Sequence, residues 1–262
     1  MPVITLFVTD IDGCLSLPYA AYDLDAFGIL RDHARAAGAP DENIGVPSVS
    51  ICSGRAYAYV EAVTQALGLT VPVLFESGGG MFDPVAAQTT WNPAFTAEVE
   101  AALEEVRHWY ATDVVGGTKM SIDHAKRTQA GVVTPDPQEI RALRPRALRF
   151  VEENVPALQV FATDNSVDVV PQGITKRTGL EWIADHVGLS MGEMAYIGDT
   201  DADVPALQAV GTSFAPSNAH DVVRACVDHV TAAAVMQGTL EAYRWCLAHN
   251  ADTPASASAA PF

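Results

Sequence analysis

The sequence predicts an α/β fold, in which a Rossmann-like core built on a parallel sheet carries an inserted α+β domain. Apolar runs and amphipathic segments alternate from residue 5 to residue 75. Between residues 84 and 170 the pattern changes to a helix followed by two strands, and this group occurs twice. From residue 176 the alternation of helix and strand resumes. An α+β arrangement of elements that interrupts an alternating pattern of helices and strands is typical of one domain inserted into another.

The first predicted strand, residues 5–9, is an apolar run of the kind that is buried on both faces of a sheet. It stops at Asp10 and Asp12, which are followed by Gly13. Residues two apart on a strand share a face, so the two carboxylates can converge on one small volume, and the glycine permits a tight exit. An isolated motif of this kind is also compatible with a strand that ends in a solvated turn.

The remaining elements of the first segment follow at the spacing of parallel strands joined by crossover helices. We predict a helix at 23–38, a strand at 47–52, a helix that ends at 68 and a strand at 71–75. The segment closes on a run of glycines at 78–80.

The inserted stretch contains two helix-strand-strand groups. We predict helices at 93–110 and 137–151, and strand pairs at 114–124 with 128–133 and at 158–163 with 166–170. The domains are therefore expected to be a discontinuous core, residues 1–82 and 171–262, and an inserted α+β domain, residues 83–170.

The parallel pattern then continues to the C-terminus. We predict helices at 176–188, 203–210, 219–226 and 238–249, strands at 194–197 and 212–215, and a loose tail at 251–262.

Composition excludes several classes of protein. The formal net charge is −17, whereas nucleic-acid backbones are bound by clustered Lys and Arg, so we expect no nucleic-acid partner. No apolar run reaches the length of about 20 residues that spans a membrane, and the N-terminus lacks the features of a signal peptide. Four scattered cysteines without a CxxC pair favour reduced thiols. We expect a cytoplasmic protein with no membrane partner.

Four carboxylates are predicted to meet at one edge of the core sheet. Asp10, Asp12, Asp199 and Asp203 all follow predicted strands, and ligands of open parallel sheets bind at the carboxyl ends of the strands. Carboxylates brought this close repel one another unless a cation intervenes. Oxygen ligands without His or Cys favour Mg²⁺ over zinc, so we predict a magnesium site. The acidic run at 198–203 is equally compatible with an acidic helix cap.

Ser53 and Lys176 each have two interpretations. Ser53 precedes a predicted helix and could be its N-cap, but a hydroxyl at a helix N-terminus can also hold phosphate. A cation at the start of a helix, such as Lys176, opposes the helix dipole. Its presence is easier to explain if an anion lies beside it.

These residues, in this order, resemble the four motifs of the haloacid dehalogenase superfamily: DIDG at 10–13, SGR at 53–55, Lys176 and GDTDAD at 198–203. The insertion between the second and third motifs resembles the type IIB cap of the Cof-like phosphatases (type C2B). The resemblance covers residues 3–249. Ala202, where the family usually has Asn, and Ser77-Gly78, where Asn-Gly is common, depart from the pattern.

The resemblance implies a Mg²⁺-dependent phosphatase that hydrolyses a small phosphomonoester, such as a sugar phosphate or phosphoglycolate. Asp10 would be the nucleophile that forms an aspartyl-phosphate, and Asp12 the general acid and base. Ser53, Gly54 and Lys176 would hold the phosphoryl group. The metal would be held by Asp10, Asp12 through its carbonyl, Asp199 and Asp203, the last directly or through water.

Two other functions are compatible with the motifs. A phosphomutase uses the same aspartyl-phosphate to move a phosphoryl group within a sugar, and a receiver-like regulator has a similar acidic cluster without turnover. The inserted domain disfavours the regulator. In the inserted domain, Lys119 and Arg127 are candidates for substrate contacts, and a solvated sheet face with no such role is the alternative. The sequence leaves the substrate and the oligomeric state open.

Overall fold

The computed structural model describes residues 2–37, 45–163 and 165–253. Its core is a five-stranded parallel sheet in the order β12-β11-β10-β1-β2, which confirms the predicted α/β fold. The strands are β1 (Leu6–Thr9), β2 (Ser48–Ile51), β10 (Met194–Ile197), β11 (Thr212–Ala215) and the short β12 (His229–Val230), which the sequence pattern did not predict.

Helices cover both faces of this sheet because the side chains of β1 alternate between two apolar clusters. Phe7 packs on one face with residues of α1 (Leu24–Ala37), α2 (Tyr57–Leu67) and α8 (Val235–Asp252). Leu6 and Val8 pack on the other face with α5 (Lys176–Val187), α6 (Val204–Leu207) and α7 (Asp221–Arg224). Every residue of β1 is buried, and the strand pairs on both sides, so it is an interior strand of the sheet.

A second, three-stranded sheet follows the first parallel segment. It comprises β3 (Val73–Phe75), β4 (Gly80–Asp83) and β5 (Gln88–Trp91), paired antiparallel. A parallel bridge between Cys52 and Leu74 joins β3 to the core sheet. The hairpin of β4 and β5 was not predicted, because β5 is mostly exposed and lacks an apolar alternation. The position between 82 and 83, the predicted start of the inserted domain, lies within β4.

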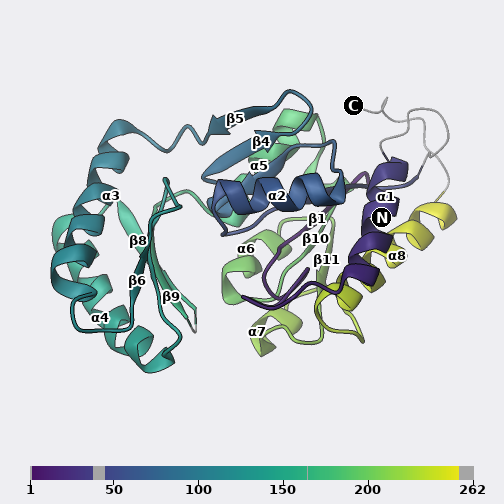
Figure 1. Cartoon of the computed structure of the whole chain (residues 1–262). Coiled ribbons are helices and arrows are strands. Elements are labelled where there is room, and N and C mark those ends of the chain that lie inside the picture. Colours follow the sequence, from purple (N-terminus) through teal and green to yellow (C-terminus); the bar gives the residue numbers. More distant parts are fainter. Residues whose placement is uncertain (1, 38–44, 164, 254–262) are drawn as a thin grey trace.

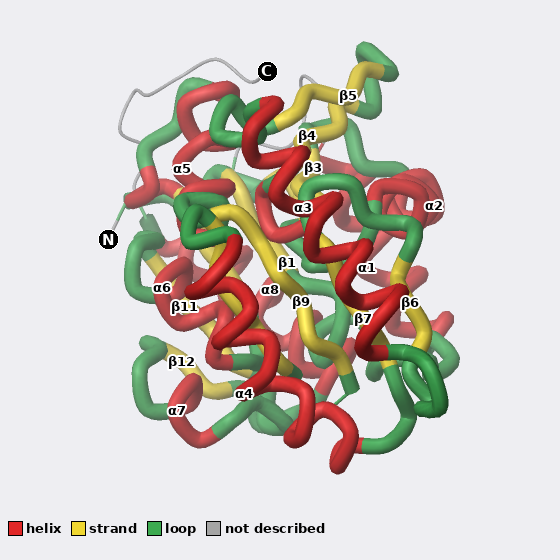
Figure 2. The backbone as a smooth tube through the Cα atoms, turned by 90° about the vertical axis from the view of Figure 1, so that its left-hand side faces the viewer, coloured by secondary structure: helices red, strands yellow, loops and turns green. Residues whose placement is uncertain are grey.

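The inserted stretch forms a four-stranded antiparallel sheet in the order β6-β7-β9-β8. Its strands are β6 (Ser121–Asp123), β7 (Ala130–Val133), β8 (Leu158–Ala162) and β9 (Ser166–Pro171), and its helices are α3 (Ala97–Trp109) and α4 (Pro137–Asn154). Figure 1 shows this sheet between the two helices and the core. In Figure 2, seen from the side of the inserted stretch, α3 and α4 lie in front of the strands.

The first strand of this sheet is shorter than predicted. Residues Tyr110–Val114 continue α3 as one π-helical turn, because Tyr110 and Val114 are buried in the cluster beneath the helices. Strand β6 therefore contains only Ser121–Asp123. The predicted helix at 203–210 is also shorter, since a 3₁₀ turn, Asp201–Asp203, precedes the four residues of α6. Most of the predicted tail, 254–262, lies outside the described residues.

A buried carboxylate joins the core to the inserted stretch. Glu76, which follows β3, is 1% exposed and accepts hydrogen bonds from the N–H groups of Arg127 and Thr128 and from the Thr128 hydroxyl. The Gln129 side chain donates to the Glu76 carbonyl over 2.8 Å.

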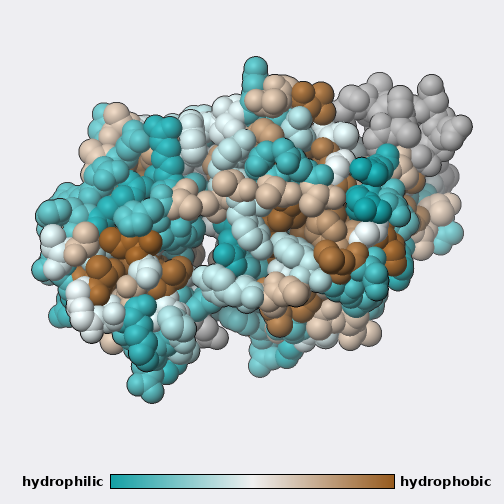
Figure 3. Space-filling model, viewed as in Figure 1, coloured by the Kyte–Doolittle hydropathy of each residue, from teal (hydrophilic) through white to brown (hydrophobic). Residues whose placement is uncertain are grey.

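The space-filling view shows a hollow between the core and the inserted stretch (Figure 3). In the described part of the chain, no helix is long and apolar enough to cross a membrane.

Candidate active site

Three of the predicted carboxylates lie together at the carboxyl ends of adjacent strands. Asp10 continues β1, and its N–H donates to the carbonyl of Ile197, the last residue of β10. Asp199 and Asp203 follow β10. One oxygen from each of Asp10, Asp199 and Asp203 lies within 4.8 Å of the others. The parallel pairing of β1 with β10 therefore brings together residues that are far apart in the sequence.

Glycines create the space that this cluster occupies. Gly13 has a φ of +76°, and a Cβ there would lie 1.8 Å from Oδ2 of Asp199. A Cβ on Gly198 would lie 2.5 Å from Cγ of Asp203. The Asn218 side chain donates to the Gly13 carbonyl over 3.0 Å and so ties this turn to the loop after β11. Alanine at position 13 would collide with Asp199, which explains the glycine after the two aspartates.

Asp203 is fully buried, and both of its oxygens are occupied. Oδ1 accepts from Lys176 Nζ at 2.5 Å and from the Tyr196 hydroxyl at 2.6 Å. Oδ2 accepts from the N–H groups of Asp199 and Thr200 and from the Thr200 hydroxyl. Burial opposes ionisation, but Lys176 and these hydrogen bonds lower the pKa of Asp203. With Thr200 as N-cap of the turn, Asp203 completes a capping box, so the predicted helix cap exists within the cluster.

Lys176 is the cation at the centre of the cluster. It is the first residue of α5 and is 6% exposed. Its ammonium group lies 2.5 Å from Asp10 Oδ2 and 2.5 Å from Asp203 Oδ1. Burial would lower the pKa of Lys176, but the two carboxylates outweigh burial and raise it. The sequence favoured an anion beside this helix start, and in this structure two aspartates lie there.

The cluster has the electrostatics of a cation site. Burial and the charges of Asp10 and Asp203 raise the pKa of Asp199 to about 8. Burial also raises the pKa of Asp10 to about 6, against the opposing effect of Lys176. Within the described residues, Oδ1 of Asp199 is buried without a hydrogen-bond partner. Carboxylates that repel one another are stabilised by a cation, and an oxygen without a hydrogen-bond partner is free to bind one. The cluster therefore fits a hard cation that takes oxygen ligands.

Asp12 is not one of the three clustered carboxylates and is paired with Arg55. Arg55 Nε lies 2.6 Å from Asp12 Oδ2, and Arg55 Nη2 lies 2.7 Å from Asp12 Oδ1. Arg55 was not predicted to have a role beyond its place in the SGR motif. No local signal identifies it, because the two partners are 43 residues apart in the chain.

Ser53 lies in the loop after β2 and is 1% exposed. Its N–H donates to the Leu74 carbonyl and its carbonyl accepts from Ser77 N, which holds the loop against the end of β3. Helix α2 begins later, at Tyr57, and its N-cap is Ala56. The N-cap interpretation of Ser53 is therefore wrong.

Comparison with known proteins agrees with this geometry. Residues 118–242 match the family model of haloacid dehalogenase-like hydrolases. Over 233 residues, 89% of this chain and 93% of the relative, the chain is 28% identical to a protein of Natronomonas pharaonis named phosphoglycolate phosphatase. The chain is thus a hydrolase similar to the haloacid dehalogenase-like hydrolases, with a phosphatase-named relative over most of its length. It is therefore an enzyme.

Solved structures share the fold of this hydrolase. A crystal structure from Thermoplasma acidophilum has a TM-score of 0.72 at 22% identity, and the match covers 94% of this chain and 99% of that one. A subclass IIB sugar phosphatase of the haloacid dehalogenase superfamily has a TM-score of 0.66 at 18% identity, over 92% and 98% of the two chains. The resemblance to the Cof-like, type IIB architecture is thus confirmed. Ala202, the departure from the family pattern, is exposed in the hydrolase.

The two basic residues predicted for the inserted stretch are both paired on its surface. The Lys119 side chain is 69% exposed and lies 3.3 Å from Asp136 at the start of α4. Arg127 is half exposed, bonds to Glu100 of α3 and lies over the ring of Trp91. Their contact with substrate stays a prediction.

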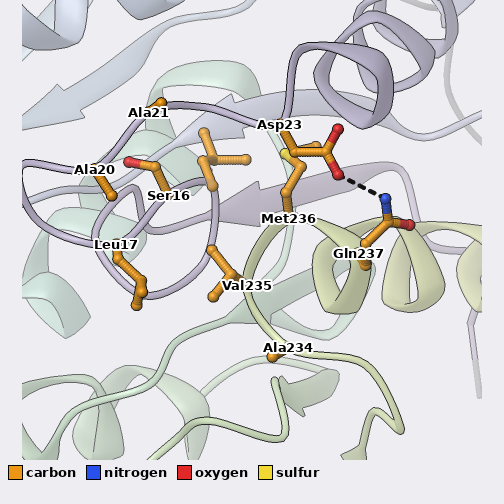
Figure 4. Close-up of a pocket in the computed structure, with 10 residues that line it drawn as sticks. Ser16, Leu17, Ala20, Ala21, Asp23, Ala234, Val235, Met236 and Gln237 are labelled. Carbon is orange, nitrogen blue, oxygen red and sulfur yellow. Dashed lines mark hydrogen bonds between the residues drawn. The ribbon is translucent and has the colours of Figure 1, made fainter.

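A cavity of about 200 Å³ adjoins the loop that follows Asp12, between that loop and the first turn of α8. Figure 4 shows Asp23 and Gln237 joined by a hydrogen bond at one side of it, at 2.8 Å. The lining is mainly apolar and contains no Lys or Arg: Leu15, Ser16, Leu17, Ala20, Ala21, Asp23, Ala234, Val235, Met236 and Gln237. This cavity therefore lacks the cations that would bind a phosphate group, and the carboxylate cluster is not part of its lining.

Proposed function

We propose that this hydrolase is a Mg²⁺-dependent phosphatase that releases phosphate from a small phosphomonoester through an aspartyl-phosphate on Asp10. The observation that carries the proposal is the cluster of Asp10, Asp199 and Asp203 around Lys176, at the carboxyl ends of two adjacent parallel strands. It combines a carboxylate nucleophile, a cation site and a fixed ammonium group in one small volume.

Asp10 has the properties of a nucleophile. Ile11 N–H donates to its Oδ1 over 2.6 Å, and Lys176 binds its Oδ2, so the carboxylate is held in one orientation. With a pKa of about 6, it is mostly ionised at pH 7 and is a better base than an exposed aspartate. Attack on phosphorus by a carboxylate oxygen of Asp10 divides the hydrolysis into two steps, which are the formation and the hydrolysis of an acyl phosphate.

The neighbouring residues would complete the reaction. Asp12 would donate a proton to the leaving oxygen and then accept one from the attacking water, a contribution typically of about 10² to 10⁴ in rate. The Ser53 hydroxyl, the Gly54 N–H and Lys176 would hold the phosphoryl oxygens. Lys176 is already fixed by Asp10 and Asp203, so it requires little reorganisation when substrate arrives.

Asp10, Asp199 and the carbonyl of Asp12 would hold Mg²⁺, and when bound the ion supplies charge neutralisation between the nucleophile and the phosphate. Asp199 is suited to this role by its orphaned oxygen. Asp203 has both oxygens occupied by five donors, so we assign it the orientation of Lys176 and of the Asp199 loop rather than direct coordination.

The substrate class follows from the relatives. A curated relative is named phosphoglycolate phosphatase, and a structure with the same fold is a sugar phosphatase. We propose a small phosphorylated metabolite, with phosphoglycolate as the first compound to test. The net charge of −17 disfavours nucleic acid.

A phosphate-release assay with metal exchange tests the proposal. We expect activity to disappear in excess chelator, to return with Mg²⁺ and to be inhibited by Ca²⁺, which prefers more ligands at longer distances, about 2.3 to 2.6 Å. Asp10→Asn should abolish turnover while circular dichroism stays unchanged. Full activity in chelator, or activity of Asp10→Asn within tenfold of wild type, would refute the mechanism. Formation of an isomeric sugar phosphate without free phosphate would identify a mutase instead.

A further inference from the structure

Arg55 is held in a built site beside the proposed acid. Its side chain is 23% exposed, and that of Asp12 is 31% exposed. Two of its nitrogens bond to the two oxygens of Asp12, at 2.6 and 2.7 Å. The guanidinium carbon lies 5.2 Å from the ring centre of Tyr19 and 5.0 Å from that of Tyr59. Both contacts are within the range of cation–π attraction.

The two tyrosines restrict the orientation of this guanidinium group. Tyr19 has a φ of +60°, in the left-handed region that non-glycine residues seldom adopt, and the residue is 75% exposed. Tyr59 is fixed by a hydrogen bond of 3.0 Å between its hydroxyl and that of Tyr22. A strained, exposed aromatic residue that contacts a charged partner indicates a functional constraint. The rings of Tyr19 and Tyr59 lie against the guanidinium group of Arg55, so its N–H groups are available mainly along its edge. Nε and Nη2 on this edge bind the carboxylate of Asp12.

The position of Arg55 relative to substrate follows from the proposed function, on which this inference rests. The acid that protonates the leaving oxygen must lie within hydrogen-bond reach of that oxygen. Arg55 is bonded directly to Asp12. Its guanidinium group therefore lies beside the leaving group, that is, beside the alcohol part of the substrate.

We propose that Arg55 is a specificity-determining residue that binds a carboxylate on the alcohol part of the substrate, exchanging Asp12 for that carboxylate. Before substrate binds, Arg55 occupies both oxygens of Asp12. When the substrate carboxylate takes over the guanidinium edge, the Asp12 oxygens are freed to face the leaving oxygen. The substrate class is then a phosphomonoester with an acidic group a few bonds from the ester oxygen.

A carboxylate fits this edge better than a hydroxyl group does. A guanidinium fork matches the two oxygens of a carboxylate, and the pairing with Asp12 shows that the edge accepts this geometry here. A hydroxyl group offers one acceptor and no charge, so it would leave either Arg55 or Asp12 partly unpaired. The exchange of one carboxylate for another leaves Arg55 paired throughout.

The test compares two substrates that differ only in this group. The first is 2-phosphoglycolate, and the second is 2-hydroxyethyl phosphate, in which a hydroxymethyl group replaces the carboxylate. We expect wild type to prefer the carboxylate by about 10- to 100-fold in kcat/KM, the range of a hydrogen-bonded charge pair. Arg55→Ala and Arg55→Gln should lower both rates and reduce the preference to within about threefold. Arg55→Lys, which keeps the charge but loses the fork, should give an intermediate preference.

Binding of stable analogues supplies a second readout that requires no turnover. We expect 3-phosphonopropionate to bind wild type at least tenfold more tightly than 3-hydroxypropylphosphonate, by calorimetry with Mg²⁺ present, and Arg55→Ala to abolish the difference. This comparison remains informative if no phosphate is released from any substrate, a result that would refute the proposed function alone. Arg31→Ala is the control, since Arg31 pairs with Asp32 on the exposed face of α1.

Three results would overturn the inference. Wild type could show no preference for the carboxylate in either assay. Arg55→Ala could lower both rates by the same factor and leave analogue binding unchanged, in which case Arg55 only positions Asp12. Alternatively, Arg127→Ala could abolish the preference while Arg55→Ala does not. Arg127 is the suitable comparison for Arg55, because it too is paired with a carboxylate and lies over aromatic rings.

Discussion

Replacement of Asp199 by asparagine is predicted to stabilise the metal-free protein and to remove its stabilisation by Mg²⁺. The side chain lies among Asp10 and Asp203, and its Oδ1 has no hydrogen-bond partner within the described residues. Asparagine has nearly the same shape and no charge. Its amide can donate to the neighbouring carboxylates, so the folded protein no longer has to bind a proton at this position, and no hydrogen bond to Oδ1 is lost.

The magnitude follows from the pKa. Burial and the neighbouring carboxylates raise the pKa of Asp199 from 3.8 to about 8. At pH 7 the folded metal-free protein keeps a proton that the unfolded chain has released, and each pH unit of this gap is about 1.4 kcal/mol. The gap of about three units corresponds to about 4 kcal/mol. Rearrangement of the loop and entry of water reduce this, so we expect Asp199→Asn to gain about 2 to 4 kcal/mol at pH 7.

The direction of the pH dependence provides a second check. Because the folded pKa lies above the unfolded value, this group makes the metal-free wild type less stable as the pH rises from about 4 to about 8. Asp199→Asn does not titrate at this position, so its stability should fall less over that range. In a protein of this size, about 1 kcal/mol moves the unfolding midpoint by about 2 to 4 °C.

Thermal unfolding in chelator and in Mg²⁺, between pH 5.5 and 8.5, measures both effects. Wild type should gain about 2.7 kcal/mol when Mg²⁺ is present at one hundred times its dissociation constant, and Asp199→Asn should gain little. Asp201→Asn is the matched control, because Asp201 is 75% exposed and bonds to His220. The reasoning fails if Asp199→Asn is less stable than wild type in chelator, or if both proteins gain equally from Mg²⁺.

Two further predictions concern buried charges. Lys176→Met leaves Asp10 and Asp203 buried without their shared cation and should lower the free energy of unfolding by about 3 to 5 kcal/mol, measured with urea at pH 7. The control is Lys119→Met, an exposed lysine that should lose less than about 1 kcal/mol. A loss as small as this for Lys176→Met would contradict the pairing. Glu76→Gln turns an amide toward the N–H donors of residues 127 and 128 and should cost about 1 to 3 kcal/mol and accelerate amide exchange at Thr128. Unchanged exchange there would show that Glu76 does not fasten the inserted stretch to the core.

The sequence was sufficient for the framework of the site. The apolar run before Asp10 predicted a buried strand inside a sheet, and β1 is an interior strand of the parallel sheet, paired with β10 and β2. Parallel strands end at the same edge, so residues that follow different strands could be predicted to meet, as Asp10 and Asp199 do. The helix that begins with Lys176 was also predictable, since its apolar period and its terminal glycine are local features.

The hairpin of β4 and β5 shows where local patterns stop being informative. Strand β5 has exposed side chains and gains its order from hydrogen bonds to β4. Strand β6 was predicted too long because buried Tyr110 and Val114 extend the preceding helix by a π turn. In both cases the deciding interaction involves a neighbouring element, and hydrophobic periodicity does not record it.

The pairings within the site were decided by the tertiary structure alone. Lys176 reaches Asp10 across 166 residues, and Arg55 reaches Asp12 across 43. The sequence shows where an element ends and which residue types stand there, because these depend on neighbours along the chain. Which oxygen is left without a partner, and which arginine holds the proposed acid, depend on the directions of side chains from separate elements, which only the packed fold determines.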